Sequence, residues 1–257
     1  MQEAENHLKL KQSQNDLAIG IWCSLGAALV TEIVAGSGCD WVLIDGEHSP
    51  NDLLSVIAQL QAMSNEAAEP VVRLPSDDAN LIKQFMDGGA RNLMIPNVRD
   101  AAQARAIVAA TRYAPEGIRG YSTGHRANRF GRIKDYHANA YKNQLLMLQI
   151  ECETGVANAA EIAAVDGVDV LFVGPGDLST NLGAMGNPNA DHVQTAIKEV
   201  MAGAKAHGKA TGILAPVKAD ADRYIDYGYT FVAVGADLGM VARGSDALMA
   251  SFGKTAK

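Results

Sequence analysis

The sequence predicts an α/β fold, a single-domain (β/α)8 TIM barrel that takes in residues 1–257. Short apolar segments typical of buried strands alternate strictly with helical segments, and this alternation implies a parallel sheet. Eight such repeats in a chain of 257 residues favour closure into a barrel over an open, doubly wound sheet. No glycine fingerprint of the dinucleotide-binding type follows the first predicted strand.

Each predicted strand is a short apolar run. In chain order the runs span residues 18–25, 41–45, 71–74, 93–95, 145–150, 170–173, 211–214 and 231–234. Side chains alternate in direction along a strand. In the fifth run, the side chains expected to meet the covering helices are Leu146, Leu148 and Ile150. The opposite face lines an interior that turns polar only at its end, with Leu145, Met147, Gln149 and Glu151.

A helix is predicted after each strand, with ends marked by capping residues and glycines. Gly36 closes the first helix, and Ser49-Pro50 begins the second with an N-cap and a proline in the first turn. Gly88 and Gly89 stop the third helix. The predicted helices span residues 27–35, 49–63, 78–87, 100–110, 154–164, 191–207, 217–227 and the segment from the last strand to about residue 250.

Composition restricts the class of function. The net charge of -7 and the pI near 5.3 argue against general binding of nucleic acid or anionic membranes. No apolar run approaches membrane-spanning length, and residues 1–16 lack the apolar core of a signal peptide. The three cysteines show no paired spacing, which suits a reducing compartment and offers no thiolate metal site. We therefore expect a cytoplasmic protein with no nucleic-acid or membrane partner.

The C-terminal ends of the strands are where barrels of this type carry their working residues. In this chain those ends carry Trp22 and Ser24; Asp45, Glu47 and His48; Arg73; Pro96 and Asn97; Gln149 and Glu151; Gly174, Pro175, Gly176 and Asp177; Leu214; and residues 235–237. Polar groups this dense on one rim are hard to explain by stability alone.

No lysine stands at a predicted strand end. A Schiff-base aldolase needs a buried lysine there, and Lys209 precedes its strand and should lie at the opposite end of the barrel. Glu151, Asp177 and Gln149 instead offer hard oxygen ligands, which suit a divalent ion such as Mg²⁺ or Mn²⁺. The set therefore favours a metal-assisted mechanism over a covalent amine mechanism.

Each of these residues also has a purely structural explanation. Glu151 and Asp177 could cap the helices that follow them or pair with arginines at the rim. His48, just before Ser49-Pro50, could be an ordinary loop histidine.

Two further charged residues are ambiguous on spacing alone. Arg73 projects into the barrel, where it could either pair with Asp45 or Glu47 or bind an anion. Asp87 ends a helix beside Gly88, which is typical of a solvated helix end.

Five segments resemble motifs of the HpcH/HpaI aldolase family. They are LIDGEHSPND (43–52), PVVRLP (70–75), YAPEGIRG (113–120), LQIECETG (148–155) and VGPGDLS (173–179). The resemblance runs in order over about residues 6–252. It implies a metal-dependent (β/α)8 pyruvate aldolase, often a hexamer assembled from dimers.

The resemblance also implies roles by motif position. Glu151 and Asp177 would bind the divalent ion, which could be Mg²⁺, Mn²⁺ or Co²⁺. The pyruvate moiety would be held by Gln149 and by the backbone of Gly174, Pro175 and Gly176, the last of which is often alanine in the family. The aldehyde end of the pocket would be shaped by Trp22 and Leu214.

The acid/base group implied by the resemblance is His48. Arg73 would neutralise charge on the C2 oxygen of pyruvate. Asp87 would raise the basicity of His48, and this role rests entirely on the resemblance because spacing alone predicts a solvated residue.

The reaction implied is reversible cleavage of a 4-hydroxy-2-oxo acid to pyruvate and an aldehyde, in aromatic or sugar-acid catabolism. Breaking the C3–C4 bond leaves the enolate of pyruvate, whose charge a divalent ion and Arg73 can stabilise. Two alternatives stay open. One is a related metal-dependent lyase or decarboxylase acting on oxaloacetate-like or citryl- or malyl-thioester substrates, and the other is a non-catalytic barrel that binds or assembles.

Residues 112–143 form a long basic insertion. Seven arginines and lysines against Glu116 and Asp135 give it a net charge of +5, and its glycines would let it fold over the barrel mouth. A charge run is usually a solvated face or a subunit contact. We hypothesise that Arg119, or a neighbour such as Arg126, attracts anionic aldehydes or completes the site of an adjacent subunit.

Overall fold

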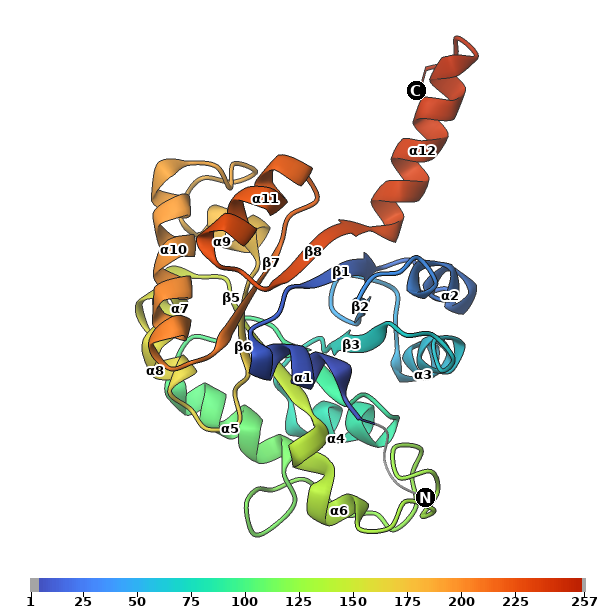
Figure 1. Ribbon diagram of the computed structural model, residues 1–257, viewed down its shortest axis with the longest axis vertical. Helices are drawn as coiled ribbons and strands as arrows, with labels where there is room; N and C mark the ends of the chain where they lie inside the picture. Colours follow the sequence, from blue (N-terminus) through green and yellow to red (C-terminus); the bar gives the residue numbers. More distant parts are fainter. Residues whose placement is uncertain (1–4, 256–257) are drawn as a thin grey trace.

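The computed structural model describes residues 5–255 and confirms the predicted fold (Figure 1). Eight parallel strands form a closed barrel in chain order, and β8 pairs with β1 to close it. Three strands have the predicted bounds, and the others differ by one or two residues at one end or, for β3, at both ends. The strands are β1 (Ala18–Cys23), β2 (Trp41–Asp45), β3 (Glu69–Arg73), β4 (Asn92–Ile95), β5 (Leu145–Ile150), β6 (Val170–Val173), β7 (Ala210–Leu214) and β8 (Phe231–Ala236).

Helices follow every strand and, except after β8, connect it to the next strand. They are α2 (Ala28–Ala35), α3 (Leu53–Ala62), α4 (Ala79–Asp87), α5 (Ala101–Thr111), α7 (Glu153–Ala157), α8 (Ala159–Ala163), α9 (Pro175–Asn181), α10 (Asp191–Ala206), α11 (Lys218–Tyr227) and α12 (Asp237–Ser251). The insertion holds α6 (Tyr136–Asn139) and the 3-10 helix η1 (Ala140–Asn143), and α1 (His7–Gln14) precedes the barrel.

Two predicted helices begin or end elsewhere for local reasons. The helix predicted to start at Ser49 starts at Leu53, because Asp52 forms a capping box with Ser55. Ser49 instead donates a hydrogen bond to the carbonyl oxygen of Asp45. The helix predicted over residues 154–164 is broken into α7 and α8 at Asn158, whose side chain donates to the carbonyl oxygen of Arg99 at 2.9 Å.

The core has two layers, and β5 contributes to both as predicted. Leu145 and Met147 lie in the interior cluster, and the alternate residues Leu146, Leu148 and Ile150 lie in the cluster between strands and helices. Burying each such side chain contributes roughly 1.5–3 kcal/mol. At the N-terminal end of the barrel, α1 adds Leu8 to the interior cluster.

The insertion lies at the N-terminal end of the barrel, against the end of α4. The Ala127 amide donates to the carbonyl oxygen of Asp87, and Arg126 Nη1 donates to the carbonyl oxygen of Gly88. The expectation that the insertion folds over the mouth of its own barrel is therefore wrong. The chain leaves α5 and enters β5 at the N-terminal end, so the insertion packs there.

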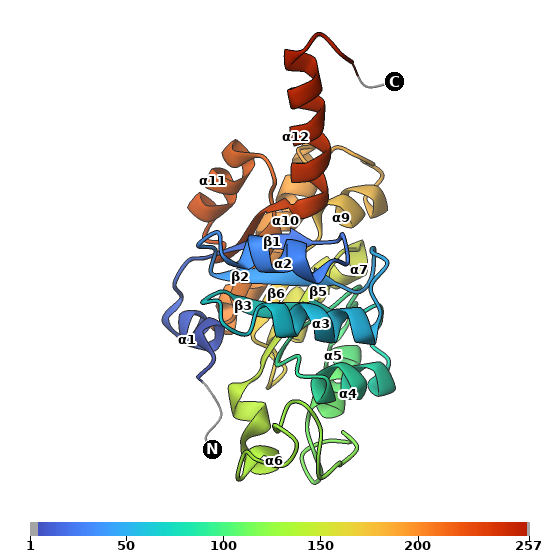
Figure 2. The ribbon, with the colours of Figure 1, turned by 90° about the vertical axis from the view of Figure 1, so that its right-hand side faces the viewer.

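The last helix departs from the pattern of the others. In both views α12 projects away from the barrel, on the side opposite to α6 (Figures 1 and 2). Within α12 only Asp237 is buried, and it accepts hydrogen bonds from the amides of Ser24 at 2.9 Å and Leu25 at 3.1 Å. Within residues 5–255 no helix is both long and apolar enough to cross a membrane.

Candidate active site

The two predicted metal ligands follow adjacent strands. Glu151 comes directly after β5 and is buried, whereas Asp177 lies in the first turn of α9 after β6 and is exposed. β5 and β6 pair in parallel, with Ile150 opposite Val173, so both carboxyl groups lie at the same mouth. This is the arrangement that the strand-end argument predicts.

Three neighbours fix the Glu151 side chain. Oε1 accepts a hydrogen bond from Gln149 Nε2 at 2.9 Å, and Oε2 accepts one from the Asn97 amide at 3.0 Å. A Cβ at position 174 would overlap Glu151 Oε1, so any larger residue there would displace the Glu151 carboxyl group. Gly176 differs, because an added Cβ would meet nothing within 4 Å.

Negative charge is concentrated around Glu151. Burial raises its pKa to about 7, and the charges of Asp177 and Glu47 raise the pKa in the same direction. Burial also raises the pKa of Glu47 above its ordinary value, although Arg73 acts in the opposite direction. A bound cation would offset the negative charge that raises the pKa of Glu151 and Glu47.

Arg73 is the positive centre of the mouth. Its Nε and Nη2 donate to the two oxygens of Asp45 at 2.9 and 2.7 Å, and its Nη1 lies 2.8 Å from Glu47 Oε2. Although burial opposes it, Arg73 holds the pKa of Asp45 below its ordinary value. Both predicted partners are therefore present. A guanidinium has five N–H groups, so two stay free for an oxyanion.

The remaining predicted mouth residues occupy different depths. Trp22 is buried beneath Arg73, whose guanidinium carbon lies 5.1 Å from its ring centroid. Leu214 is half-buried and packs against the same interior cluster. His48 is exposed and its amide donates to Asp45 Oδ1 at 3.3 Å. Within the described residues its imidazole has no hydrogen-bond partner, so it is free to meet a substrate or another chain.

Asp87 is not brought to this mouth. It is the last residue of α4, which runs back from the end of β3 to the start of β4, so it lies at the opposite end of the barrel from His48. Its Oδ1 accepts a hydrogen bond from Arg119 Nη2 at 2.6 Å. The Arg119 side chain is fully buried, and Arg126 lies against Gly88 and Gly89. Within residues 5–255, none of the three forms a hydrogen bond or ion pair with a mouth residue.

The chemistry of the mouth fits a divalent ion. Glu151 and Asp177 supply carboxylate oxygens, and Gln149 Oε1 is a buried acceptor without a hydrogen-bond partner in the described chain. All are hard oxygen donors of the kind that Mg²⁺ and Mn²⁺ prefer. No group of three or more histidine, cysteine, aspartate or glutamate residues suited to a metal occurs within residues 5–255.

Lys209 lies where the sequence predicts. It precedes β7, and its Nζ donates to the carbonyl oxygen of Val168, just before β6, at 2.8 Å. Both positions are at the N-terminal end of the barrel. Within the described chain no strand ends in a lysine, so a Schiff-base mechanism has no candidate residue.

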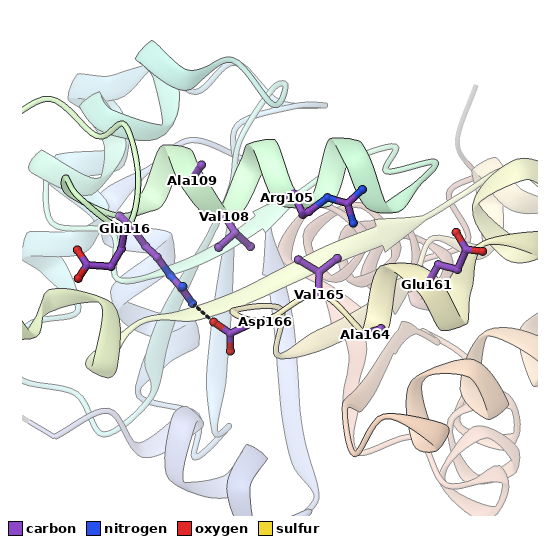
Figure 3. Close-up of a pocket in the computed structure, with 9 residues that line it drawn as sticks. Arg105, Val108, Ala109, Glu116, Glu161, Ala164, Val165 and Asp166 are labelled. Atoms are coloured by element: carbon purple, nitrogen blue, oxygen red, sulfur yellow. Dashed lines mark hydrogen bonds and ion pairs between the residues drawn. The ribbon is translucent and has the colours of Figure 1, made fainter.

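A surface pocket elsewhere carries none of the predicted residues. It lies between α5 and the turn before β6, and an ion pair of 3.0 Å joins Arg112 to Asp166 across it (Figure 3). Both segments belong to the N-terminal end of the barrel, so this pocket is separate from the mouth.

Two residues at the mouth were not among the predicted site residues. Asn97 gives its backbone amide to Glu151 from a left-handed conformation with φ of 55°, which asparagine tolerates well. Asp45 orients Arg73 and also accepts from the amide of Glu47 at 3.0 Å. The sequence places both residues at strand ends and offers Asp45 as a partner of Arg73, but the role of Asn97 depends on its backbone conformation, which spacing does not give.

Comparisons with known proteins agree on one family. A family model described as HpcH/HpaI aldolase/citrate lyase matches residues 18–244. A 5-keto-4-deoxy-D-glucarate aldolase of Salmonella arizonae is 47% identical over 249 residues, 97% of each chain. An HpcH/HpaI aldolase/citrate lyase family structure from Burkholderia cenocepacia superposes with a TM-score of 0.94 at 37% identity, covering 97% of this chain and 100% of that chain. Citrate synthase SbnG superposes with a TM-score of 0.85 at 28% identity, covering 95% and 96%.

Proposed function

The chain belongs to the HpcH/HpaI aldolase/citrate lyase family, and we propose that it cleaves 5-keto-4-deoxy-D-glucarate, the diacid named in its relatives. It is a metal-dependent carbon–carbon lyase of the aldolase class. The observation that carries the substrate proposal is 47% identity across 97% of both chains. The oxygen donors on β5 and after β6 supply the matching chemistry.

The proposed substrate is a 4-hydroxy-2-oxo acid when numbered from its keto end, as the sequence predicts. Its methylene carbon joins the carbonyl carbon to a carbon that bears a hydroxyl group. Cleavage between the methylene and the hydroxyl-bearing carbon gives pyruvate and a three-carbon aldehyde with one hydroxyl and one carboxylate. This assigns the enzyme to sugar-acid catabolism.

We propose that Glu151 and Asp177 hold the divalent ion and that Gln149 and the backbone of residues 174–176 hold the pyruvate portion. A bound divalent ion would draw electrons from the carbonyl group and so stabilise the enolate. Arg73 would direct its two free N–H groups at the same oxygen. Asp45 and Glu47 keep the guanidinium in one orientation before substrate arrives.

We propose that His48 moves the proton. It takes the proton from the C4 hydroxyl as the C3–C4 bond breaks, the electron pair stays on C3, and the aldehyde leaves. In synthesis the same imidazole returns the proton to the new alkoxide. His48→Ala should slow aldol cleavage while metal affinity and oxaloacetate decarboxylation, which needs only the enolate, stay nearly unchanged. Normal aldol cleavage by this variant would contradict the assignment.

The substrate proposal is tested by aldol synthesis with pyruvate as donor and a panel of aldehydes, in the presence of Mg²⁺, Mn²⁺ or Co²⁺. We expect the three-carbon hydroxy aldehyde acid to give the highest kcat/KM. The comparison aldehyde is succinic semialdehyde, which would form the seven-carbon 4-hydroxy-2-oxoheptane-1,7-dioate. A clear preference for succinic semialdehyde would overturn the choice of substrate but not the reaction class.

A second candidate function comes from the likeness to citrate synthase SbnG. The same mouth could serve a related lyase or decarboxylase that acts on oxaloacetate-like or acyl-thioester substrates. The 47% identical aldolase disfavours this candidate. Assays with acyl thioesters and with oxaloacetate would separate the two.

We propose that the protein is a homo-oligomer built on exchange of α12. In the other repeats a helix covers its strands, but α12 leaves the outer face of β1 and β8 uncovered, where Ile19, Ile21 and Val234 are only half-buried. The exposed apolar residues of the projecting segment are Leu238, Met240, Val241, Leu248, Met249 and Phe252. The α12 helix of a second copy would cover this open face and would bury its own apolar residues there. The hexamer implied by the resemblance would need further contacts.

Because Asp87 and His48 lie at opposite ends of one barrel, we propose that Asp87 serves His48 of a second copy. Two features support this. The insertion beside Asp87 exposes Ile118, Tyr121 and Phe130, each about two-thirds or more accessible (70%, 67% and 67%), as an interface would. The insertion is also basic and the mouth is acidic, so one copy's insertion complements another copy's mouth.

We also propose a cytoplasmic location. The three cysteines are free, and two of them, Cys23 and Cys152, are buried as small apolar residues. Unpaired thiols suit a reducing compartment.

A further inference from the structure

We propose that Arg119 is a positioning residue, which holds Asp87 in the orientation that His48 of a second copy requires. The inference rests on the proposed function, in which Asp87 acts on His48. It concerns the YAPEGIRG segment, which the proposed reaction leaves without a role.

The geometry leaves one oxygen of Asp87 engaged and the other available. Arg119 Nη2 donates to Oδ1 at 2.6 Å, and His125 Nε2 lies 3.8 Å from the same oxygen. Within the described residues Oδ2 accepts no hydrogen bond, and the Asp87 side chain is 24% exposed. A carboxylate held by one oxygen presents the second in a fixed direction, as a group that orients an imidazole must.

Arg119 is itself rigidly placed. Its guanidinium carbon lies 4.6 Å from the ring centroid of Tyr113, and its amide donates to the carbonyl oxygen of Arg112 at 2.8 Å. The side chain is fully buried, so it cannot meet a substrate directly. It can influence the reaction only through its neighbours, and among these Asp87 is the group that accepts its side-chain hydrogen bond.

A purely structural account explains this pair poorly. Nε and Nη1 of Arg119 are buried without hydrogen-bond partners in the described chain, and so is the Tyr113 hydroxyl. Burying a guanidinium with unpaired N–H groups costs free energy, and a buried ion pair is weak evidence of net stabilisation. What the cluster does provide is a carboxylate that is held in one orientation, in an insertion that also exposes Ile118 and Tyr121.

The test compares Arg119→Gln, Arg119→Lys, Asp87→Asn and the double variant Arg119→Gln/Asp87→Asn in the intact oligomer. Arg119→Gln should lower kcat/KM for aldol cleavage about 10–100-fold, the usual cost of losing a supporting hydrogen bond. Oxaloacetate decarboxylation and metal affinity should change less than about twofold, because neither needs the His48 proton transfer. The acidic limb of the pH–rate profile should move to lower pH, since His48 becomes less basic.

Two comparisons make the role specific. The double variant should be no slower than Asp87→Asn alone, because Arg119 acts only through Asp87. Arg119→Lys, which keeps the charge, should recover part of the rate. The matched control is Arg105→Gln, which removes the same charge from an exposed residue of α5, outside the insertion, and should leave all these readouts unchanged.

Additive losses in the double variant, or equal loss of cleavage and decarboxylation, would show that Arg119 is merely structural. Unchanged cleavage by Arg119→Gln, with slow cleavage by Asp87→Asn, would overturn this inference alone. If Asp87→Asn cleaves normally, the proposed function of Asp87 fails, and this inference with it. Should Arg119→Gln fail to assemble, Arg119→Lys carries the same test, since a normal rate and normal pH profile would contradict the role.

Discussion

At the scale of single residues, Glu151 shows how the mouth is prepared for a cation. Burial and the charges of Asp177 and Glu47 oppose its ionisation and raise its pKa to about 7. The Asn97 amide and Gln149 fix both of its oxygens. The carboxyl group is therefore placed where its charge costs free energy until a positive ion balances it.

This predicts that the metal-free protein becomes less stable as the pH rises. With a folded pKa of about 7 against an ordinary 4.5, the ionised form costs up to roughly 3 kcal/mol. The stability that the protonated Glu151 carboxyl group contributes is fully present below pH 4.5 and is lost as the pH rises through 7. Glu151→Gln should therefore raise the Tm of metal-free protein at pH 8 relative to the wild type, and the gain should be absent near pH 4.5. An equal gain at both pH values would contradict the placement of this charge.

The two glycines after β6 give a matched pair of substitutions. Gly174→Ala should abolish metal-dependent cleavage, because the new Cβ would overlap Glu151 Oε1. Gly176→Ala should keep activity and stabilise the protein by about 0.4–1 kcal/mol, because its Cβ meets open space and the unfolded chain loses freedom. Thermal unfolding and pyruvate release measure both. Similar activity in the two variants would contradict the geometry of the loop.

Residue-scale prediction from sequence succeeds where alternation along a strand decides the outcome. Gln149 and Glu151 point into the barrel because β5 is a regular strand, and Arg73 meets Asp45 because β2 and β3 are in register at those residues. Asn97 escapes prediction because its role depends on a left-handed backbone conformation and a backbone amide. The contact between Asp87 and Arg119 escapes because the two residues come from different elements.

At the scale of elements, helix α12 departs most from the barrel pattern. Only its first residue is buried, and the apolar residues along it are exposed. It projects from the barrel (Figure 2). The strands that it should cover keep the half-buried side chains of Ile19, Ile21 and Val234. Helix exchange between copies requires two complementary apolar surfaces on one chain, and α12 and the uncovered face of β1 and β8 provide them.

Charged residues on α12 should therefore separate the copies. The double substitution Val241→Asp and Leu248→Asp should convert the oligomer to monomers, as measured by light scattering on a sizing column. The control is Leu10→Asp on α1, where an exposed leucine lies outside the proposed contact. Monomeric wild type, or an unchanged mass in the double variant, would contradict the exchange.

The sequence predicts elements well where a hydrophobic period and a cap coincide. The helices predicted to start at residues 78 and 100 form as α4 and α5, with Asp78 and Asp100 as their N-caps. The short α9 is missed because Gly-Pro-Gly resembles a loop, and α1 is missed because its residues are mostly polar and only Leu8 is buried. The direction of α12 could not be predicted, because its residues would suit a helix that covers its own barrel or one that covers the barrel of a second copy.

At the scale of the whole molecule, charge is divided between the two ends of the barrel. The mouth collects Asp45, Glu47, Glu151 and Asp177, and the basic insertion with its net charge of +5 lies at the other end. One chain cannot bring these ends together. Two copies can, and the substrate proposed here carries two carboxylates that the acidic mouth alone would repel.

Shared sites between copies predict complementation. His48→Ala and Asp87→Asn should each be slow alone, but co-expressed subunits should recover activity, roughly a quarter of wild type for random pairing in a symmetric oligomer. Recovery occurs because some sites combine an intact His48 with an intact Asp87 from the neighbour. Mixing each variant with His48→Ala/Asp87→Asn provides the control. No recovery would place both residues in the same chain's site.

The central claim is that carboxylates from neighbouring strands hold a divalent ion that makes bond cleavage possible. The most direct measurement is pyruvate release from the six-carbon diacid by enzyme stripped with a chelator, then titrated with Mn²⁺, beside Glu151→Gln and Asp177→Asn. We predict no release from stripped enzyme, full recovery on titration, and greatly weakened Mn²⁺ binding in both variants. Full activity in the stripped enzyme, or wild-type Mn²⁺ affinity in both variants, would contradict the claim.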